Sequence, residues 1–150
     1  MSAPSPHPAP THPNASPPAR TRIKICGLTR EQDVDAAVAA GADAVGFVLY
    51  EKSPRHVTPA LGAELARRLP PFVSPVLLFV NADASIIEAA TDHFALGWLQ
   101  FHGDETPAQC LQAALRCGWP WMRAARIPAG QAFDLLEFAR TWHQARAILL

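Results

Sequence analysis

Short apolar runs alternate along the chain with longer amphipathic segments from about residue 21 onwards. The runs are only a few residues long and carry few polar side chains, which is typical of strands buried on both faces of a parallel sheet. The longer segments between them have apolar residues at helical spacing. We predict strands over 23–28, 44–49, 76–80, 96–101, 121–127 and 146–150.

Capping signals mark where several of the intervening helices begin. Thr58 and Thr106 are each followed by a proline, and threonine at the cap with proline in the first turn favours a helix start. The helix after Asn81 or Asp83 is expected to bury Ile86 with its neighbour Ile87, and the helix after Thr106 is expected to bury Leu115. We predict five helices in all, one after each of the first five strands.

The alternation of strands and helices predicts an α/β fold with a parallel sheet, and two architectures fit it. A doubly wound open sheet is disfavoured, because no G-x-G-x-x-G segment follows any predicted strand. A (β/α)₈ TIM barrel gathers polar residues at the carboxyl ends of its strands. Such residues occur here at Cys26, Asn81, Gln100, His102 and Arg126.

A complete barrel of this kind takes about 250 residues. The part of the chain from Thr21 to Leu150 has 130. We therefore expect a barrel truncated to about six parallel strands and five helices, forming one domain over 21–150.

Residues 1–20 form a separate segment by composition. Seven of them are proline, interleaved with serine, alanine and histidine, so the segment has little to bury and is expected to be a disordered, proline-rich tail. A transit peptide is the weaker interpretation, because Arg20 is its one basic residue.

The composition of the chain limits which cellular environments and which binding partners are expected. Charge is balanced, with 13 basic and 13 acidic residues, which argues against a nucleic acid or a membrane surface as partner. Three cysteines without a CxxC pair predict neither a disulfide framework nor a metal site, and they fit a reducing, cytoplasmic location. No apolar run approaches the roughly 20 residues of a membrane helix.

Cys26 is the candidate for chemistry, because it precedes a glycine turn and a helix start whose dipole favours a thiolate. A cysteine there can act as a general base or nucleophile, although cysteine is also a common buried residue. A redox role is disfavoured, since no resolving cysteine lies nearby in sequence. Cys110 and Cys117 lie seven apart on one helix and are interpreted as structural.

Several polar residues in the predicted loops are candidates for binding. Arg55 can hold a carboxylate or phosphate through its guanidinium, or it can belong to a solvated charged loop. His102 can relay a proton or satisfy a loop backbone. Arg123 and Arg126 lie three apart in the fifth strand, so we expect at most one to face the barrel interior; the alternative is a salt bridge towards the helices.

Five segments in register together resemble the N-terminal two-thirds of the phosphoribosylanthranilate isomerase family. They are KICGLT at 24–29, GADAVGFV at 41–48, KSPRHV at 52–57, FVN at 79–81 and LQFHGDE at 99–105.

The resemblance implies a (β/α)₈ barrel that acts in tryptophan biosynthesis, where it isomerises N-(5′-phosphoribosyl)anthranilate by an Amadori rearrangement without cofactor or metal. It implies that Cys26 is the general base, removing the C2′ proton of a Schiff-base intermediate. It also implies that Arg55 binds the anthranilate carboxylate. With Gln100 and His102, Arg55 makes up the substrate-binding residues we expect.

The chain departs from the family pattern at its end. The family's general acid is an aspartate after the sixth strand, and its phosphate site belongs to the seventh and eighth units, whereas this sequence stops at Leu150. We therefore expect residues 1–150 alone to lack isomerase activity. The alternatives are an incomplete barrel that associates with a second chain supplying the missing strands, or another phosphosugar-processing barrel enzyme.

Overall fold

The structure is a computed structural model that describes residues 20–130 and 132–150. The tail predicted over 1–20 lies outside the described residues, apart from Arg20. Strands and helices alternate in the order predicted. The strands are β1 (Lys24–Cys26), β2 (Ala44–Val48), β3 (Ser74–Phe79), β4 (Trp98–Phe101), β5 (Trp121–Ala124) and β6 (Ala147–Leu149). The helices are α1 (Glu31–Ala39), α2 (Pro59–Ala66), α3 (Ala84–Thr91), α4 (Pro107–Cys117) and α5 (Leu135–Thr141).

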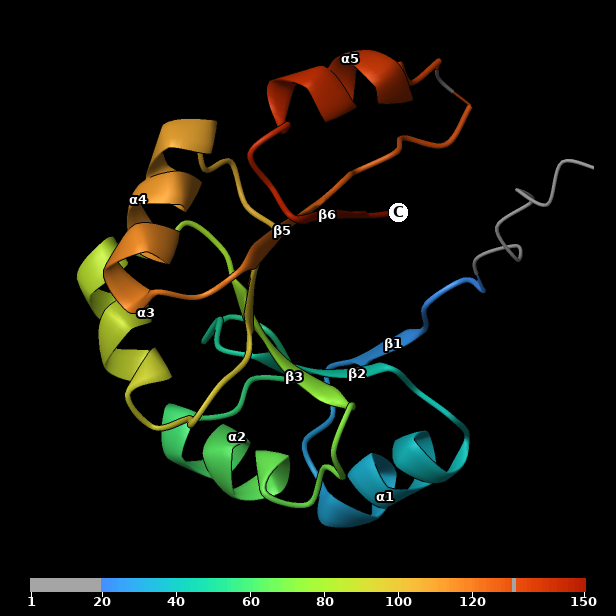
Figure 1. Cartoon of the computed structure of the whole chain (residues 1–150), viewed down its shortest axis with the longest axis vertical. Coiled ribbons are helices and arrows are strands. Elements are labelled where there is room, and N and C mark those ends of the chain that lie inside the picture. Colours follow the sequence, from blue (N-terminus) through green and yellow to red (C-terminus); the bar gives the residue numbers. More distant parts are fainter. Residues whose placement is uncertain (1–19, 131) are drawn as a thin grey trace, which may run out of the picture.

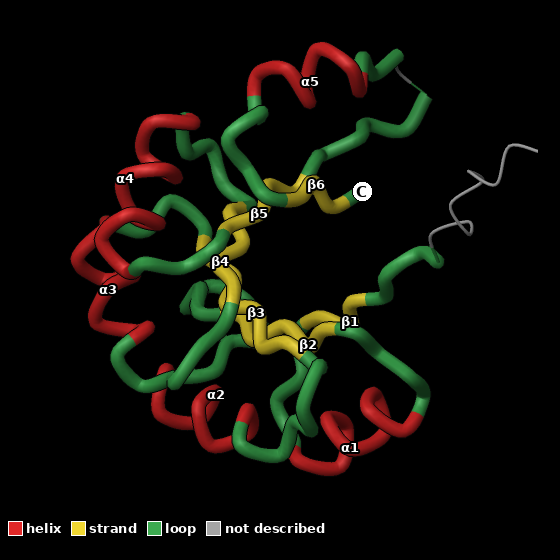
Figure 2. The backbone as a smooth tube through the Cα atoms, viewed as in Figure 1, coloured by secondary structure: helices red, strands yellow, loops and turns green. Residues whose placement is uncertain are grey.

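The strands pair in chain order from β1 to β6, and every pair is parallel. A doubly wound sheet would instead reverse its strand order at a switch point. The helices lie outside the curved sheet (Figure 1), and the strands follow an arc around the centre (Figure 2). This is part of a (β/α)₈ barrel, as predicted, and among the described residues β1 and β6 are its two edges.

The main apolar core lies between the sheet and the surrounding helices. Alternate side chains of the strands point outwards into it, and the largest of these are at most 1% exposed. They are Val45, Phe47, Leu77, Phe79, Leu99 and Phe101. Because strand side chains alternate between faces, the residues between them face the concave side of the sheet.

Two of the predicted helix starts have the side-chain caps that their sequence indicates. The Thr58 hydroxyl accepts a hydrogen bond from the backbone N–H of Leu61 at 3.2 Å. Thr106 and Gln109 form a reciprocal capping box at the start of α4. At the other end of α4, Gly118 takes a left-handed conformation with φ 67°, which favours glycine.

The predicted inward faces of α3 and α4 are wrong at one residue each. Ile86 is 58% exposed and Leu115 is 73% exposed, whereas their neighbours Ile87 and Ala114 are buried. Adjacent helical residues point about 100° apart. A pair of neighbouring apolar residues therefore does not tell which of the two packs on the sheet.

Asp43 ties the start of β1 to the start of β2. Its carboxylate accepts hydrogen bonds from the Arg20 and Arg22 guanidinium groups and from the backbone N–H of Ile23. These contacts, with the Arg20 hydrogen bond the strongest, hold the pKa of Asp43 well below its usual range. They fix the position of the strand that carries Cys26.

No helix within residues 20–130 and 132–150 is long and apolar enough to cross a membrane.

Two leucine-to-alanine substitutions test the placement of the core. Leu99 is fully buried, so Leu99→Ala should lower the free energy of unfolding by roughly 2–5 kcal/mol, through lost burial and a residual cavity. Leu115→Ala removes the same atoms from an exposed site and should change it by about 0.5 kcal/mol or less. Urea unfolding of both variants measures this, and equal losses would contradict the placement.

Candidate active site

All four residues predicted to act at the site line one cavity of about 290 Å³ at the carboxyl ends of the strands. Cys26 comes from the end of β1, Arg55 from the loop after β2, Gln100 from β4 and His102 from the loop that follows it. The full lining is Cys26, Val48, Tyr50, Ser53, Arg55, Leu78, Val80, Gln100, His102 and Leu149.

The Cys26 side chain lies next to a glycine of the neighbouring strand β2. It pairs in register with Gly46, and the backbone N–H of Gly27 donates to the Gly46 carbonyl at 2.8 Å. A Cβ atom at Gly46 would lie 2.8 Å from the Cys26 Sγ, closer than such atoms approach. Glycine at this position therefore makes room for the thiol on the concave side of the sheet.

Arg55 lies directly beside Cys26. Its Nη1 donates to the Cys26 carbonyl at 3.4 Å, and its Cδ lies 2.7 Å from where a Cβ of Gly27 would be. The backbone N–H of Arg55 donates to the Ser53 hydroxyl at 3.1 Å. A bridge between Val48 and the residue after Arg55 holds the loop against β2. The guanidinium is thus placed to bind a planar carboxylate near the thiol.

Gln100 and His102 form a pair on the same wall of the cavity. Gln100 is 1% exposed, and its Nε2 lies 3.4 Å from Nδ1 of His102. Its Oε1 is buried without a hydrogen-bond partner among the described residues. Burial lowers the pKa of His102, and the positive charges of Arg126, Arg123 and Lys24 lower it further. We therefore expect a neutral imidazole near pH 7, which can accept or donate a proton.

A buried ion pair between Arg123 and Glu105, a partner that the sequence did not predict, supports this wall from the outer side. Arg123 and Glu105 approach to 2.7 Å and are each less than 10% exposed. The Arg123 guanidinium also donates to the Gly103 carbonyl at 2.7 Å and lies 4.3 Å from the Trp142 ring centre. Of the two alternatives for Arg123, the salt bridge towards the helices is therefore the one observed. In the sequence, a charged residue within an otherwise apolar strand was the feature that indicated a buried ion pair.

Glu105 also joins the loops after β3 and β4. Its carboxylate accepts from the backbone N–H of Asn81 at 2.7 Å and from that of Gly103 at 2.9 Å. The Asn81 side chain accepts in turn from the Asp104 N–H at 2.7 Å. A Cβ at Gly103 would lie 2.3 Å from Asn81 Oδ1, so only glycine fits there. The residues that flank His102 are held rigidly.

Arg126 does not lie in a strand, because β5 ends at Ala124 and not at 127 as predicted. It is exposed, donates to the His102 carbonyl and lies 3.3 Å from the carboxylate of Asp104. The opposite-face argument for Arg123 and Arg126 is therefore wrong, since it needs both in one strand. Arg126 instead connects two loops at the rim of the cavity.

The other two cysteines do not line the cavity. Cys110 is fully buried in α4, and burial raises the pKa of its thiol to about 12. Burial also raises the pKa of Cys117. Both are therefore poor nucleophiles near neutral pH, which fits the structural role predicted for them.

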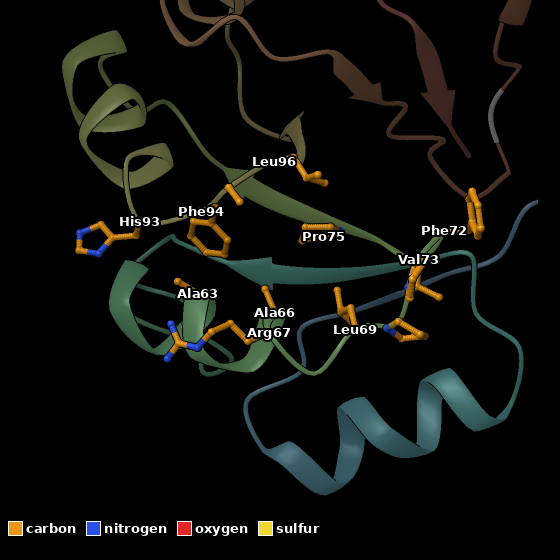
Figure 3. A pocket seen from close by; sticks show the side chains of 13 residues that line it. Ala63, Ala66, Arg67, Leu69, Phe72, Val73, Pro75, His93, Phe94 and Leu96 are labelled. Atoms are coloured by element: carbon orange, nitrogen blue, oxygen red, sulfur yellow. The ribbon is translucent and has the colours of Figure 1, made fainter.

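A larger cavity, of about 470 Å³, lies at the opposite end of the strands. Figure 3 shows its lining between the loops that precede β3 and β4, with Pro75, Phe94 and Leu96 among the side chains. It contains none of the residues predicted to act at the site. Its lining is mostly apolar and has no acid or thiol, and its ionisable side chains are Arg67 and His93.

Within the described ranges, no group of three or more histidine, cysteine, aspartate or glutamate residues is arranged to hold a metal ion.

A curved parallel sheet wrapped by helices, with a thiol, a guanidinium, an amide and an imidazole gathered at its carboxyl edge, defines a barrel of the (β/α)₈ enzyme class. A family model described as N-(5′-phosphoribosyl)anthranilate isomerase matches residues 23–150. The chain belongs to this family.

Individual relatives agree. The chain is 62% identical over 133 residues to an N-(5′-phosphoribosyl)anthranilate isomerase of Leptothrix cholodnii, a match that covers 89% of this chain and 58% of the relative. The crystal structure of the Thermotoga maritima phosphoribosyl anthranilate isomerase superposes with a TM-score of 0.75 at 33% identity, covering 87% of this chain and 61% of that one.

A further crystal structure of phosphoribosyl anthranilate isomerase holds reduced 1-(o-carboxyphenylamino)-1-deoxyribulose 5-phosphate. It also superposes with a TM-score of 0.75 at 33% identity and covers 87% of this chain and 64% of that one. The chain thus spans less than two thirds of the length of these relatives.

The buried ion pair should matter far more to stability than an exposed pair nearby. Glu105→Gln leaves the buried Arg123 charge without its anion, so it should cost roughly 3–5 kcal/mol of unfolding free energy. Asp104→Asn removes the partner of the exposed Arg126 and should cost about 0–1 kcal/mol. Chemical denaturation measures both. A loss for Glu105→Gln as small as that for Asp104→Asn would contradict the pairing.

The lowered pKa of His102 determines whether its contribution to the stability of the fold rises or falls with pH. An ordinary histidine titrates near 6.5. Because folding lowers the pKa of His102, its neutral form stabilises the fold fully above about that pH, and this contribution is lost as the pH falls through the folded value. NMR titration of the His102 ring, assigned with His102→Gln, should give a midpoint below that of a free histidine peptide. A higher midpoint would exclude this environment.

Proposed function

We propose that this protein is a phosphoribosylanthranilate isomerase of tryptophan biosynthesis. It would convert N-(5′-phosphoribosyl)anthranilate into the carboxyphenylamino-deoxyribulose phosphate by an Amadori rearrangement. The observation that carries the proposal is the convergence of Cys26, Arg55, Gln100 and His102 on one cavity in a chain of this family. A cytoplasmic location stays a prediction from the cysteine content.

In this proposal Cys26 is the general base. After the sugar ring opens, the Schiff base carries an acidified proton on C2′. The thiolate takes this proton, the electrons of the broken C–H bond form a C1′–C2′ double bond, and the π electrons of the C1′–nitrogen double bond move onto the nitrogen to give an enolamine. Tautomerisation then yields the ketone, so the reaction moves protons and consumes no oxidant. A thiolate is a competent base near neutral pH in a site shielded from water.

Arg55 and the Gln100–His102 pair would orient the substrate. The Arg55 guanidinium beside Cys26 suits the anthranilate carboxylate, since the two planar groups can form paired hydrogen bonds. The amide and imidazole on the β4 side offer donors and acceptors to sugar hydroxyl groups. This arrangement would set the anthranilate ring near β1 and the sugar towards β4.

Ring opening also needs an acid. None of the described residues lining the cavity is an aspartate or glutamate. Leu149, at the end of β6, belongs to the lining, so the carboxyl end of β6 reaches the same cavity. In the family pattern an aspartate after the sixth strand is the acid, and the carboxyl end of β6 is where such a residue would reach the cavity.

Steady-state kinetics on protein expressed from the complete reading frame test the roles of Cys26 and Arg55. The fluorescence of the anthranilate substrate provides the assay. Cys26→Ser should lower kcat by about 10²–10⁴-fold, because it removes the base. Arg55→Met should act mainly by raising KM, since it removes a binding contact.

Cys117→Ser is the matched control, because it makes the same atomic change away from the cavity, and it should leave kcat unchanged. Product-analogue binding, measured with reduced 1-(o-carboxyphenylamino)-1-deoxyribulose 5-phosphate, separates loss of chemistry from loss of binding. Wild-type kcat in Cys26→Ser would rule out the thiol as base. Absence of isomerase activity in the wild-type protein would rule out the function itself.

A further inference from the structure

Lys24 is half-buried on the concave side of the sheet, next to the proposed base. It lies two residues before Cys26 in β1, so both side chains leave the strand on the same face. Its Nζ atom is inaccessible to solvent and has no hydrogen-bond partner among the described residues. Nor does it form an ion pair with a carboxylate of the described part of the chain.

The Lys24 ammonium and the Cys26 thiol both lie over Gly46 of β2. A Cβ built on Gly46 would lie 2.5 Å from the Lys24 Nζ and 2.8 Å from the Cys26 Sγ. The Lys24 Nζ and the Cys26 Sγ therefore lie less than about 6 Å apart. Within this range an opposite charge favours the charged form of an ionisable group. A side chain at Gly46 would displace both.

A buried ammonium without an anion is unfavourable, and the structure offers one group nearby that can become an anion. The acidic side chains of the loop after β4 point elsewhere, since Glu105 pairs with Arg123 and Asp104 with Arg126. The thiol of Cys26, in contrast, becomes an anion on losing its proton. An ion pair between Lys24 and a Cys26 thiolate satisfies the charge of both.

We propose that Lys24 is a positioning residue that holds Cys26 in its thiolate form. The inference rests on the proposed function, in which the thiolate is the base. The other titratable or charged side chains lining the cavity around the thiol are Tyr50, Arg55 and His102. Arg55 donates to the carbonyl of Cys26, and His102 lies across the cavity on the β4 side. Lys24 is thus a cation whose charged atom lies beside the sulfur on the same face of β1.

The experiment measures the rate at which iodoacetamide alkylates Cys26 as a function of pH. Mass spectrometry of the tryptic peptide that contains Cys26 separates it from the other two cysteines. In Lys24→Met the midpoint of the rate profile should move to higher pH, and alkylation at pH 7 should slow by roughly tenfold. Lys24→Arg keeps a cation at this place and should restore most of the rate.

Arg67→Met is the matched control, because it removes one positive charge from an exposed site. Arg67 follows the carboxyl end of α2, at the opposite end of the strands from Cys26. It should leave the profile unchanged, which separates a local effect from one of net charge. If Lys24→Met does not fold, the wild-type protein still decides, since its alkylation midpoint should lie below that of a free cysteine peptide. A wild-type midpoint at or above that of the peptide overturns the proposal, as does an unshifted profile in folded Lys24→Met.

The outcomes for this inference and for the proposed function are distinguishable. Alkylation reads the thiol and does not need substrate, so it can respond to Lys24 even in a protein that has no isomerase activity. Conversely, an active enzyme whose Cys26 alkylation ignores Lys24 keeps its function and loses this inference. In an active enzyme, Lys24→Met should also move the lower limb of the kcat profile to higher pH while changing KM little.

Discussion

The consecutive parallel pairing of the strands is the constraint on which the site depends. It brings all their carboxyl ends to one edge, so residues far apart in sequence, such as Cys26 and His102, line a single cavity. The pairing also fixes how far along the strands each of these residues lies, because the register sets Cys26 opposite Gly46 and Leu78 opposite Gln100. A shift of one residue in any pair would turn the inward side chains towards the helices. The chemistry of the concave face is thus a consequence of the register.

That register is supported by fixed contacts at the ends of the strands and in the loops that follow them. Asp43 anchors the start of β1, and the loop carrying Arg55 is bridged to β2. Glu105 and Arg123 hold the loop of His102 through backbone groups rather than through the histidine itself. The imidazole is therefore positioned by its backbone and by the contact of its Nδ1 with Gln100 Nε2. Rigid loops around free side chains are what a site needs in order to hold reacting groups in place.

The sequence was sufficient for those parts of the structure that local pattern determines. Strand ends located Cys26, Gln100 and His102, and capping residues located the starts of α2 and α4. It was insufficient where the outcome depends on three-dimensional packing. Ile86 and Ile87 are equally apolar, and only the docking of α3 selects Ile87 for burial. The Glu105–Arg123 pair joins two segments that strand pairing brings together, and Trp142 packs on the Arg123 guanidinium. No local sequence pattern reveals these contacts.

The polar groups on the two faces of the sheet differ in how completely they are satisfied. On the outer face, Arg123 has a carboxylate, a carbonyl and an aromatic ring around it, although its Nε has no acceptor among the described residues. On the concave face, Lys24 Nζ and Gln100 Oε1 are buried without partners in the same part of the chain. Buried polar groups are costly unless they are paired. The outer-face guanidinium is therefore largely paired within the protein, whereas Lys24 Nζ and Gln100 Oε1 on the concave face keep unused hydrogen-bonding capacity. This difference in satisfaction, rather than the presence of polar residues alone, distinguishes the functional face from the supporting one.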